Sequence, residues 1–124
     1  MPAIEEQNRL GDVLKYEADN LYSRDEVTVA SGQNLTIGTV IGVVTADGKV
    51  VAHDPTANDG SEVAAGVLCE DIDTVSGDKT SWIVARHATV SEDGLIWPDG
   101  ITAGQLAIAI AQLKSLGILV RKGA

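Results

Sequence analysis

The chain has 124 residues, enough for one domain that buries roughly two-thirds of the surface of its unfolded state. Apolar residues make up 44% of it, but there are two tryptophans, two tyrosines and no phenylalanine, so Val, Ile, Leu and Ala must fill the core. The net charge of −9 argues against a nucleic-acid-binding surface and against an anionic membrane, and no apolar run approaches the roughly 18 residues of a membrane span.

The first 26 residues are polar and acidic, with seven carboxylates against three basic side chains. Leu10, Val13 and Leu14 have helical spacing, although Gly11 between them weakens a helix. The start of the chain lacks the basic and apolar segments of a secretion signal, which indicates synthesis in a cytoplasm. We expect residues 1–26 to be an N-terminal arm, disordered or partly helical in the free protein, that becomes ordered on a partner. A frayed terminus is the simpler alternative.

From Val27 onward, apolar segments alternate with turn residues, a pattern that is typical of short β-strands. Strands are expected at residues 27–30, 35–45, 50–53, 66–73, 80–91, within 92–100 and at 117–123. The Asp47-Gly48 pair predicts a hairpin turn, because these residues tolerate positive φ, and residues 54–65 are expected to form a polar loop. Glycines within residues 35–45 predict bends or the close approach of another backbone.

Residues 102–117 carry the one strongly predicted helix. Thr102 and Gln105 have the spacing of a capping box, and Gly117 suits the left-handed conformation that ends a helix. One stripe of this helix is expected to be buried: Leu106, Ala109, Ile110, Leu113 and Leu116. Ile108 lies nearly opposite, where it is expected to contact the sheet or a neighbouring subunit. The fold class is therefore α+β, a small β-rich domain of residues 27–124 with mixed short strands and one C-terminal helix.

No set of residues points to catalysis, a cofactor or a metal. The polar loop at 53–62 is rich in carboxylates, but a calcium loop starting at Asp54 would need a glycine and a glutamate where Asp59 and Ala65 stand. Two histidines and one cysteine are too few for a zinc site, and no serine lies in a nucleophile elbow. Cys69, the only cysteine, is expected to be a buried residue whose neighbouring acids raise its thiol pKa. We expect no enzyme activity.

Trp97 precedes Pro98 in a chain with few aromatic side chains. A tryptophan here can be a core anchor, a subunit-interface anchor or part of a ligand pocket, and tryptophan is enriched at interface hot spots. Core burial is the simplest interpretation. The ligand-pocket interpretation leads to one functional alternative, a small β-rich ligand- or carbohydrate-binding module whose pocket uses Trp82 or Trp97.

In their order and spacing, these segments resemble the head decoration proteins of lambda-like bacteriophages. Residues 38–68, GTVIGVVTADGKVVAHDPTANDGSEVAAGVL, resemble the family's strand, hairpin, polar loop and returning strand. Residues 71–100 resemble its next hairpin and its Leu-x-Trp-Pro-like element, here Leu95, Trp97 and Pro98, and residues 106–120 resemble its closing helix and strand. The similarity covers residues 21–122. The first residues differ, because the best-known members have an arm rich in Thr, Ser, Pro and Ala.

The resemblance implies a homotrimer with no catalytic activity that binds the major capsid protein of its phage at three-fold positions, on the outer surface of the expanded head. Flexible N-terminal arms would extend onto neighbouring capsid subunits and cement the shell against the pressure of packaged DNA. The arm residues expected to contact the capsid are Leu10, Val13, Leu14, Leu21 and Tyr22. The residues expected to form the trimer interface or a core anchor are Trp97, Pro98 and Ile108.

Overall fold

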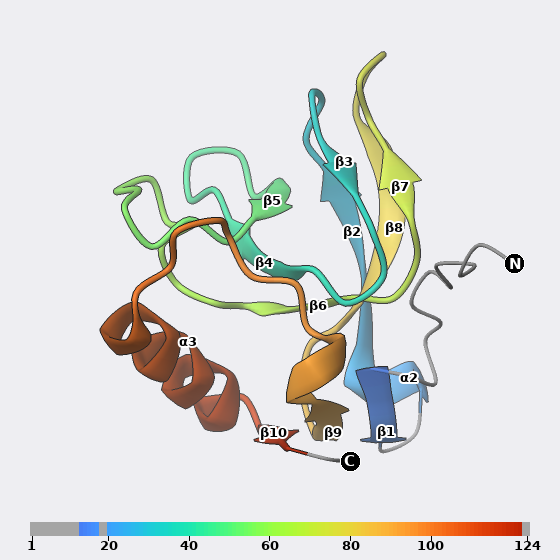
Figure 1. Ribbon diagram of the computed structural model, residues 1–124. Coiled ribbons are helices and arrows are strands. Elements are labelled where there is room, and N and C mark those ends of the chain that lie inside the picture. The colour runs from blue at the N-terminus through green and yellow to red at the C-terminus, as the bar shows by residue number, and fades with distance from the viewer. Residues whose placement is uncertain (1–12, 18–19, 123–124) are drawn as a thin grey trace, which may run out of the picture.

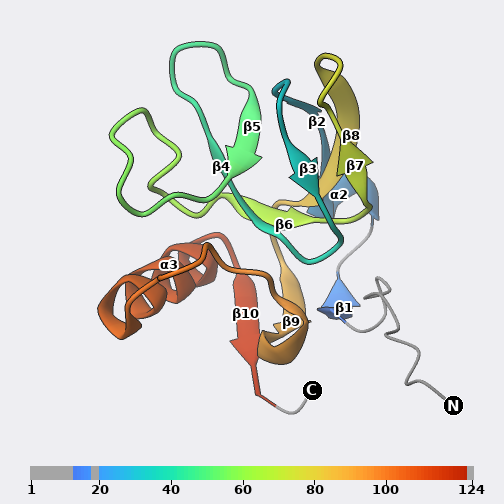
Figure 2. The ribbon, with the colours of Figure 1, turned by 45° about the horizontal axis from the view of Figure 1, so that its top comes forward.

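The computed structural model describes residues 13–17 and 20–122, with only the backbone of residues 20–21. In this part of the chain, five strands close into a barrel, three strands form a second sheet and two strands form a small ribbon (Figures 1 and 2). One long helix lies beside the second sheet. The predicted α+β class with a β-rich body and a C-terminal helix is confirmed. No helix in the described residues has the length and hydropathy needed to cross a membrane.

The barrel is built from short strands that are rich in β-branched residues. Its strands, in spatial order, are β2 (Arg24–Val29), β5 (Val50–Ala52), β4 (Val40–Val43), β6 (Gly66–Leu68) and β8 (Lys79–Val84). β2 and β8 pair antiparallel along their whole length, from Arg24 opposite Val84 to Val29 opposite Lys79. Their inward side chains alternate with exposed ones, as expected for strands with one buried face. The ribbon, β3 (Asn34–Leu35) with β7 (Ile72–Asp73), adds to the barrel core.

The second sheet joins strands from both ends of the described chain. Its order is β1 (Leu14–Glu17), β9 (Ala88–Ser91) and β10 (Ile118–Arg121), with β1 antiparallel and β10 parallel to β9. The pairing places Leu14, Val90 and Val120 in one row across the sheet. Within the described residues, β1 and β10 are therefore the two edge strands (Figure 2).

Helix α3 (Ala103–Ser115) packs its buried face on a core shared by both sheets. The predicted capping box is confirmed: Thr102 Oγ1 accepts from the Gln105 N–H at 3.1 Å, and Gln105 Oε1 accepts from the Thr102 N–H at 3.0 Å. Leu113 is fully buried in this core. Leu116 was expected on the buried stripe but is 36% exposed, because the helix has ended and the chain turns there into β10. The predicted final strand is confirmed as β10.

Regular structure in the described residues begins before the boundary predicted at Val27. β2 begins at Arg24, and residues 13–17 already contribute β1 to the second sheet. The polar composition that suggested a solvated arm has another cause, because charged side chains at these positions are paired: Arg24 with Glu17, and Asp25 with a later arginine. Residues 13–17 and 20–26 therefore belong to the folded body.

Three predicted strands are divided, and a fourth is missing. Residues 66–73 form β6 in the barrel and β7 in the ribbon, and residues 69–71 belong to neither strand. Residues 80–91 form β8 and β9 in different sheets, because the chain turns between them at His87, where φ is 49°. Residues 35–45 divide at Gly38, where φ is 93° and a Cβ would lie 2.3 Å from the carbonyl oxygen of Gly94. Residues 92–100 form a 3-10 helix, η1 (Glu92–Gly94), and one bridge between Thr39 and Ile96.

Candidate functional site

The N-terminal part of the chain is anchored in the body through β1. Val13 is fully buried in the core under α3, and Leu14 packs against the same core. Of the side chains that the sequence suggested as capsid contacts, Val13 is thus a core residue and Leu14 is partly buried against the core. Leu10 lies outside the described residues, as does the side chain of Leu21. Tyr22 is 47% exposed and remains available for contact.

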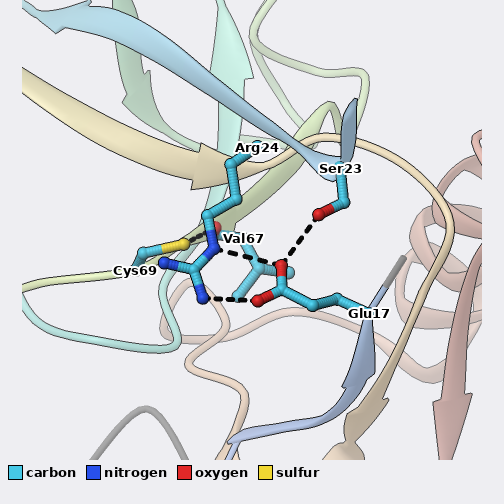
Figure 3. Close-up of polar contacts among 5 residues, drawn as sticks. All are labelled: Glu17, Ser23, Arg24, Val67 and Cys69. Carbon is cyan, nitrogen blue, oxygen red and sulfur yellow. Dashed lines mark hydrogen bonds and ion pairs between the residues drawn. The ribbon is translucent and has the colours of Figure 1, made fainter. Parts of the chain in front are cut away.

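A polar cluster ties the end of β1 to the beginning of β2 (Figure 3). Glu17 Oε2 accepts hydrogen bonds from Ser23 Oγ at 2.8 Å and from Arg24 Nε at 3.0 Å. Arg24 Nη2 donates to the other carboxylate oxygen, which makes the pair bidentate. Ser23 ends α2 (Asn20–Ser23), the single helical turn between the two strands. The cluster therefore links the second sheet to the barrel.

The same cluster changes the protonation of its members. The hydrogen bond from Arg24 holds the pKa of Glu17 below its ordinary value, and the pKa of Arg24 is raised in return. Cys69 lies beside the guanidinium in Figure 3. Burial raises the pKa of the Cys69 thiol to about 11, and Arg24 opposes this only in part. The expected raised pKa is confirmed, with burial as its main cause, and the thiol is neutral and unreactive at neutral pH.

Replacement Glu17→Gln is expected to lower the free energy of unfolding by roughly 1–2 kcal/mol at pH 7, because it weakens a partly buried, charge-assisted pair. The pKa of Glu17 is lowered in the folded protein, so the stabilisation is present above the unfolded pKa of about 4.5 and is lost as the pH falls through the folded pKa. Urea unfolding of wild type and variant from pH 7 to pH 3 should therefore converge at the acid end. The exposed Glu26→Gln is the control; a constant gap across the range would contradict the assignment.

Three of the aromatic side chains lie on the surface. Tyr16, Tyr22 and Trp82 are 64%, 47% and 45% exposed. The Tyr22 ring packs against the His87 ring with a centroid distance of 4.9 Å, and the Arg86 guanidinium lies 5.7 Å from the Tyr22 centroid. Because aromatic side chains are enriched in protein interfaces, their exposure here favours a protein-binding surface over a core role.

Trp97 and Pro98 line a small pocket next to the barrel. The pocket has a volume of about 170 Å³, and the buried His53 also lines it, with its ring edge-on to Trp97 at 6.5 Å. Trp97 is partly buried and packs on the core under α3, and the peptide bond before Pro98 is trans. Ligand pockets usually exceed about 300 Å³, and Trp82 is not part of this one. The pocket gives little support to a small-molecule or carbohydrate module.

Ile108 lies on the side of α3 that faces the polar loop. It is 60% exposed and lines a shallow hollow together with Pro55, Gln105 and Gln112. Gln112 Oε1 accepts a hydrogen bond from the Ala64 N–H at 2.9 Å, which fixes the polar loop onto the helix. Ile108 was expected to contact either the sheet or a neighbouring subunit. No strand residue lines this hollow. Contact with a neighbouring subunit stays a prediction.

The family model of the bacteriophage lambda head decoration protein D matches residues 3–118, a range that spans the barrel, β1, β9 and α3 and ends at the first residue of β10. The chain belongs to this family. It is a structural protein of the phage capsid, and it associates with the capsid in the virion. The resemblance seen in the sequence is confirmed. No curated protein sequence matches the chain.

The carboxylates in the polar loop of this decoration protein stabilise turns. Asp54 Oδ1 accepts from the Thr56 hydroxyl at 2.8 Å, and Asp59 Oδ1 accepts from the Ser61 hydroxyl at 2.6 Å. These hydrogen bonds lower the pKa of both aspartates. No group of three metal-ligating side chains occurs in the described ranges 13–17 and 20–122. The loop that looked most like a site in the sequence has a structural role here.

Proposed function

We propose that this decoration protein is a cement for the phage head. It binds as a homotrimer at three-fold positions on the outside of the expanded head, and it stabilises the shell against the pressure of the packaged DNA. The family match over residues 3–118 carries the proposal, because the match covers most of the chain, including the whole barrel and α3. The net charge of −9 supports it, since an acidic surface suits the outside of the shell, away from the genome.

The arm that bridges to neighbouring capsid subunits is residues 1–12 in this proposal, and β1 is its anchor. A 12-residue segment spans at most about 40 Å when extended, which is long enough to reach beyond one small domain. An extended segment can add a strand to an exposed sheet edge of another protein. Because the segment loses conformational entropy when it binds, each contact is weak, but three arms on one trimer act together.

The contact residues separate into two groups under this proposal. Leu10, Leu21 and Tyr22 remain candidates for direct contact with the major capsid protein. Val13, which is buried in the core, and Leu14, which is partly buried against it, hold the anchor in place. Ile108 and the Trp97-Pro98 segment are the candidates for the trimer interface, since Ile108 is exposed on α3 and Trp97 is half-buried.

Deletion of residues 2–12 is expected to leave a folded protein that binds expanded, undecorated capsids at least tenfold more weakly than wild type. Binding is measured by cosedimentation, and wild type should saturate at three copies per three-fold site. Deletion of residues 1–20 is the comparison: it also removes β1 and the buried Val13, so it should lower thermal stability as well. Equal capsid affinity of wild type and the 2–12 deletion would remove the arm from the mechanism.

A further inference from the structure

A groove on the body lies between α3 and the edge strand β10. It has a volume of about 260 Å³, and its walls combine apolar side chains with two cations: Ile110, Lys114, Leu119, Val120 and Arg121. Both views show α3 running beside β10 on the side of the sheet away from β1 (Figures 1 and 2). The groove is therefore separate from the anchor of the arm.

The charges around this groove differ from those of the rest of the protein. Lys114, Arg121 and Lys122 are all exposed, and none of the three forms an ion pair with any residue of the described chain. Three other cations, Arg24, Lys49 and Arg86, are already paired with carboxylates. In a chain of net charge −9, this surface is a local concentration of available positive charge.

The backbone of β10 can accept a further strand. The Ala88 N–H donates to the Gly117 carbonyl at 3.1 Å, so in this parallel ladder the Gly117 carbonyl and the backbone polar groups of Leu119 and Arg121 point toward β9. The N–H and C=O of Val120 therefore point away from β9, toward the open edge. No strand of the described chain pairs there.

We propose that the groove between α3 and β10 binds an extended acidic segment of a capsid subunit, which adds a strand to β10 and places its carboxylates beside Lys114 and Arg121. The proposal rests on the proposed function for the source of the segment. Strand addition supplies affinity through the backbone, and the cations select an acidic partner. This contact is a second attachment to the shell, independent of residues 1–12.

The backbone part of the proposal is tested with two proline variants. Val120→Pro removes the outward N–H without removing a hydrogen bond to β9, whereas Leu119→Pro removes an inward one. Val120→Pro is expected to keep most of its thermal stability and to bind DNA-free expanded capsids about tenfold more weakly. Leu119→Pro should lose stability. Wild-type affinity in a folded Val120→Pro protein would overturn strand addition.

The charge part is tested with Lys114→Glu combined with Arg121→Glu, and the exposed Lys79→Glu serves as the control. The double variant should bind DNA-free capsids at least tenfold more weakly at low salt, while the control changes affinity less than twofold. The same double variant is also made in the protein that lacks residues 2–12. A similar fold-change in both backgrounds supports an independent capsid contact.

The remaining outcomes each overturn a defined statement. If the double variant has no effect once residues 2–12 are deleted, the groove holds the arm of a decoration protein and the proposal fails. If capsids that contain DNA bind the protein and DNA-free capsids do not, the groove recognises nucleic acid, and the proposal also fails. If the wild type binds expanded capsids and the groove variants bind them with the same affinity, only the groove proposal is wrong. If the wild type does not bind expanded capsids at all, the proposed function fails as well.

Discussion

Replacement Leu113→Ala is expected to lower the free energy of unfolding by about 3–5 kcal/mol. Leu113 is fully buried where α3 meets the core that both sheets share. Truncation removes the transfer free energy of the side chain and leaves a cavity, because the surrounding strands cannot close around it. A domain of this size has a total stability of about 5–15 kcal/mol, so the variant should approach the unfolding threshold. Urea unfolding followed by circular dichroism measures the difference.

Ile108→Ala on the same helix is the matched control. Ile108 is 60% exposed, so its truncation should change the free energy of unfolding by less than about 0.5 kcal/mol. The same variant also addresses trimerisation, since a lower mass in solution or on the capsid with unchanged monomer stability would place Ile108 in the interface. Equal destabilisation by the two truncations would show that α3 does not pack on the sheets through Leu113.

Replacement Gly42→Ala is expected to lower the free energy of unfolding by about 3 kcal/mol. Gly42 lies in β4, and a Cβ there would lie 2.5 Å from the carbonyl oxygen of Ser61 and 2.6 Å from its Cα. These are backbone atoms, so the added methyl can be accommodated only by moving the strand or the polar loop. The loss should appear in the urea midpoint at unchanged slope.

Gly104→Ala is the control for the same chemical change. Gly104 lies in the first turn of α3, where the nearest atom to an added Cβ is the Thr102 hydroxyl oxygen at 4.0 Å. Alanine there should stabilise the protein by roughly 0.5–1 kcal/mol, because it has a higher helix propensity. If Gly42→Ala also had no destabilising effect, the contact between β4 and the polar loop would be looser than this structure has it.

The elements that the sequence predicted well are those governed by local chemistry. The helix was recognisable because Thr102 and Gln105 cap it and Gly117 follows its end. The hairpin between β4 and β5 was recognisable from Asp47-Gly48. The division of residues 80–91 into two strands was not recognisable, because the residue with positive φ is His87 and not a typical turn residue such as Gly or Asn. That conformation is determined by contacts distant in sequence.

The candidate site shows the same division. Burial of Cys69 was predicted because a lone cysteine is usually a small buried residue. The cluster of Glu17, Ser23 and Arg24 could not be predicted in this way. Ser23 and Arg24 are six and seven residues from Glu17, too far for a direct contact along one helix, and all three lie in a segment whose charge suggested solvent exposure. One signal in the sequence indicated that this segment is folded. Val13 and Leu14 are adjacent large apolar residues, which a fully solvated arm would not require. The pairing of β1 with β9 is a long-range contact that no local pattern predicts.

The placement of β1 determines how the protein responds to mechanical force. A pull on the residues before Leu14, directed along β1, acts perpendicular to the hydrogen bonds that join β1 to β9. All of these bonds then carry the tension together, in shear, whereas a sideways pull would unzip them one at a time. Glu17 and Arg24 clamp the far end of the strand to the barrel. Under the proposed cement function, the pressure of packaged DNA that pulls residues 1–12 along β1 would therefore load this sheet in its more resistant direction.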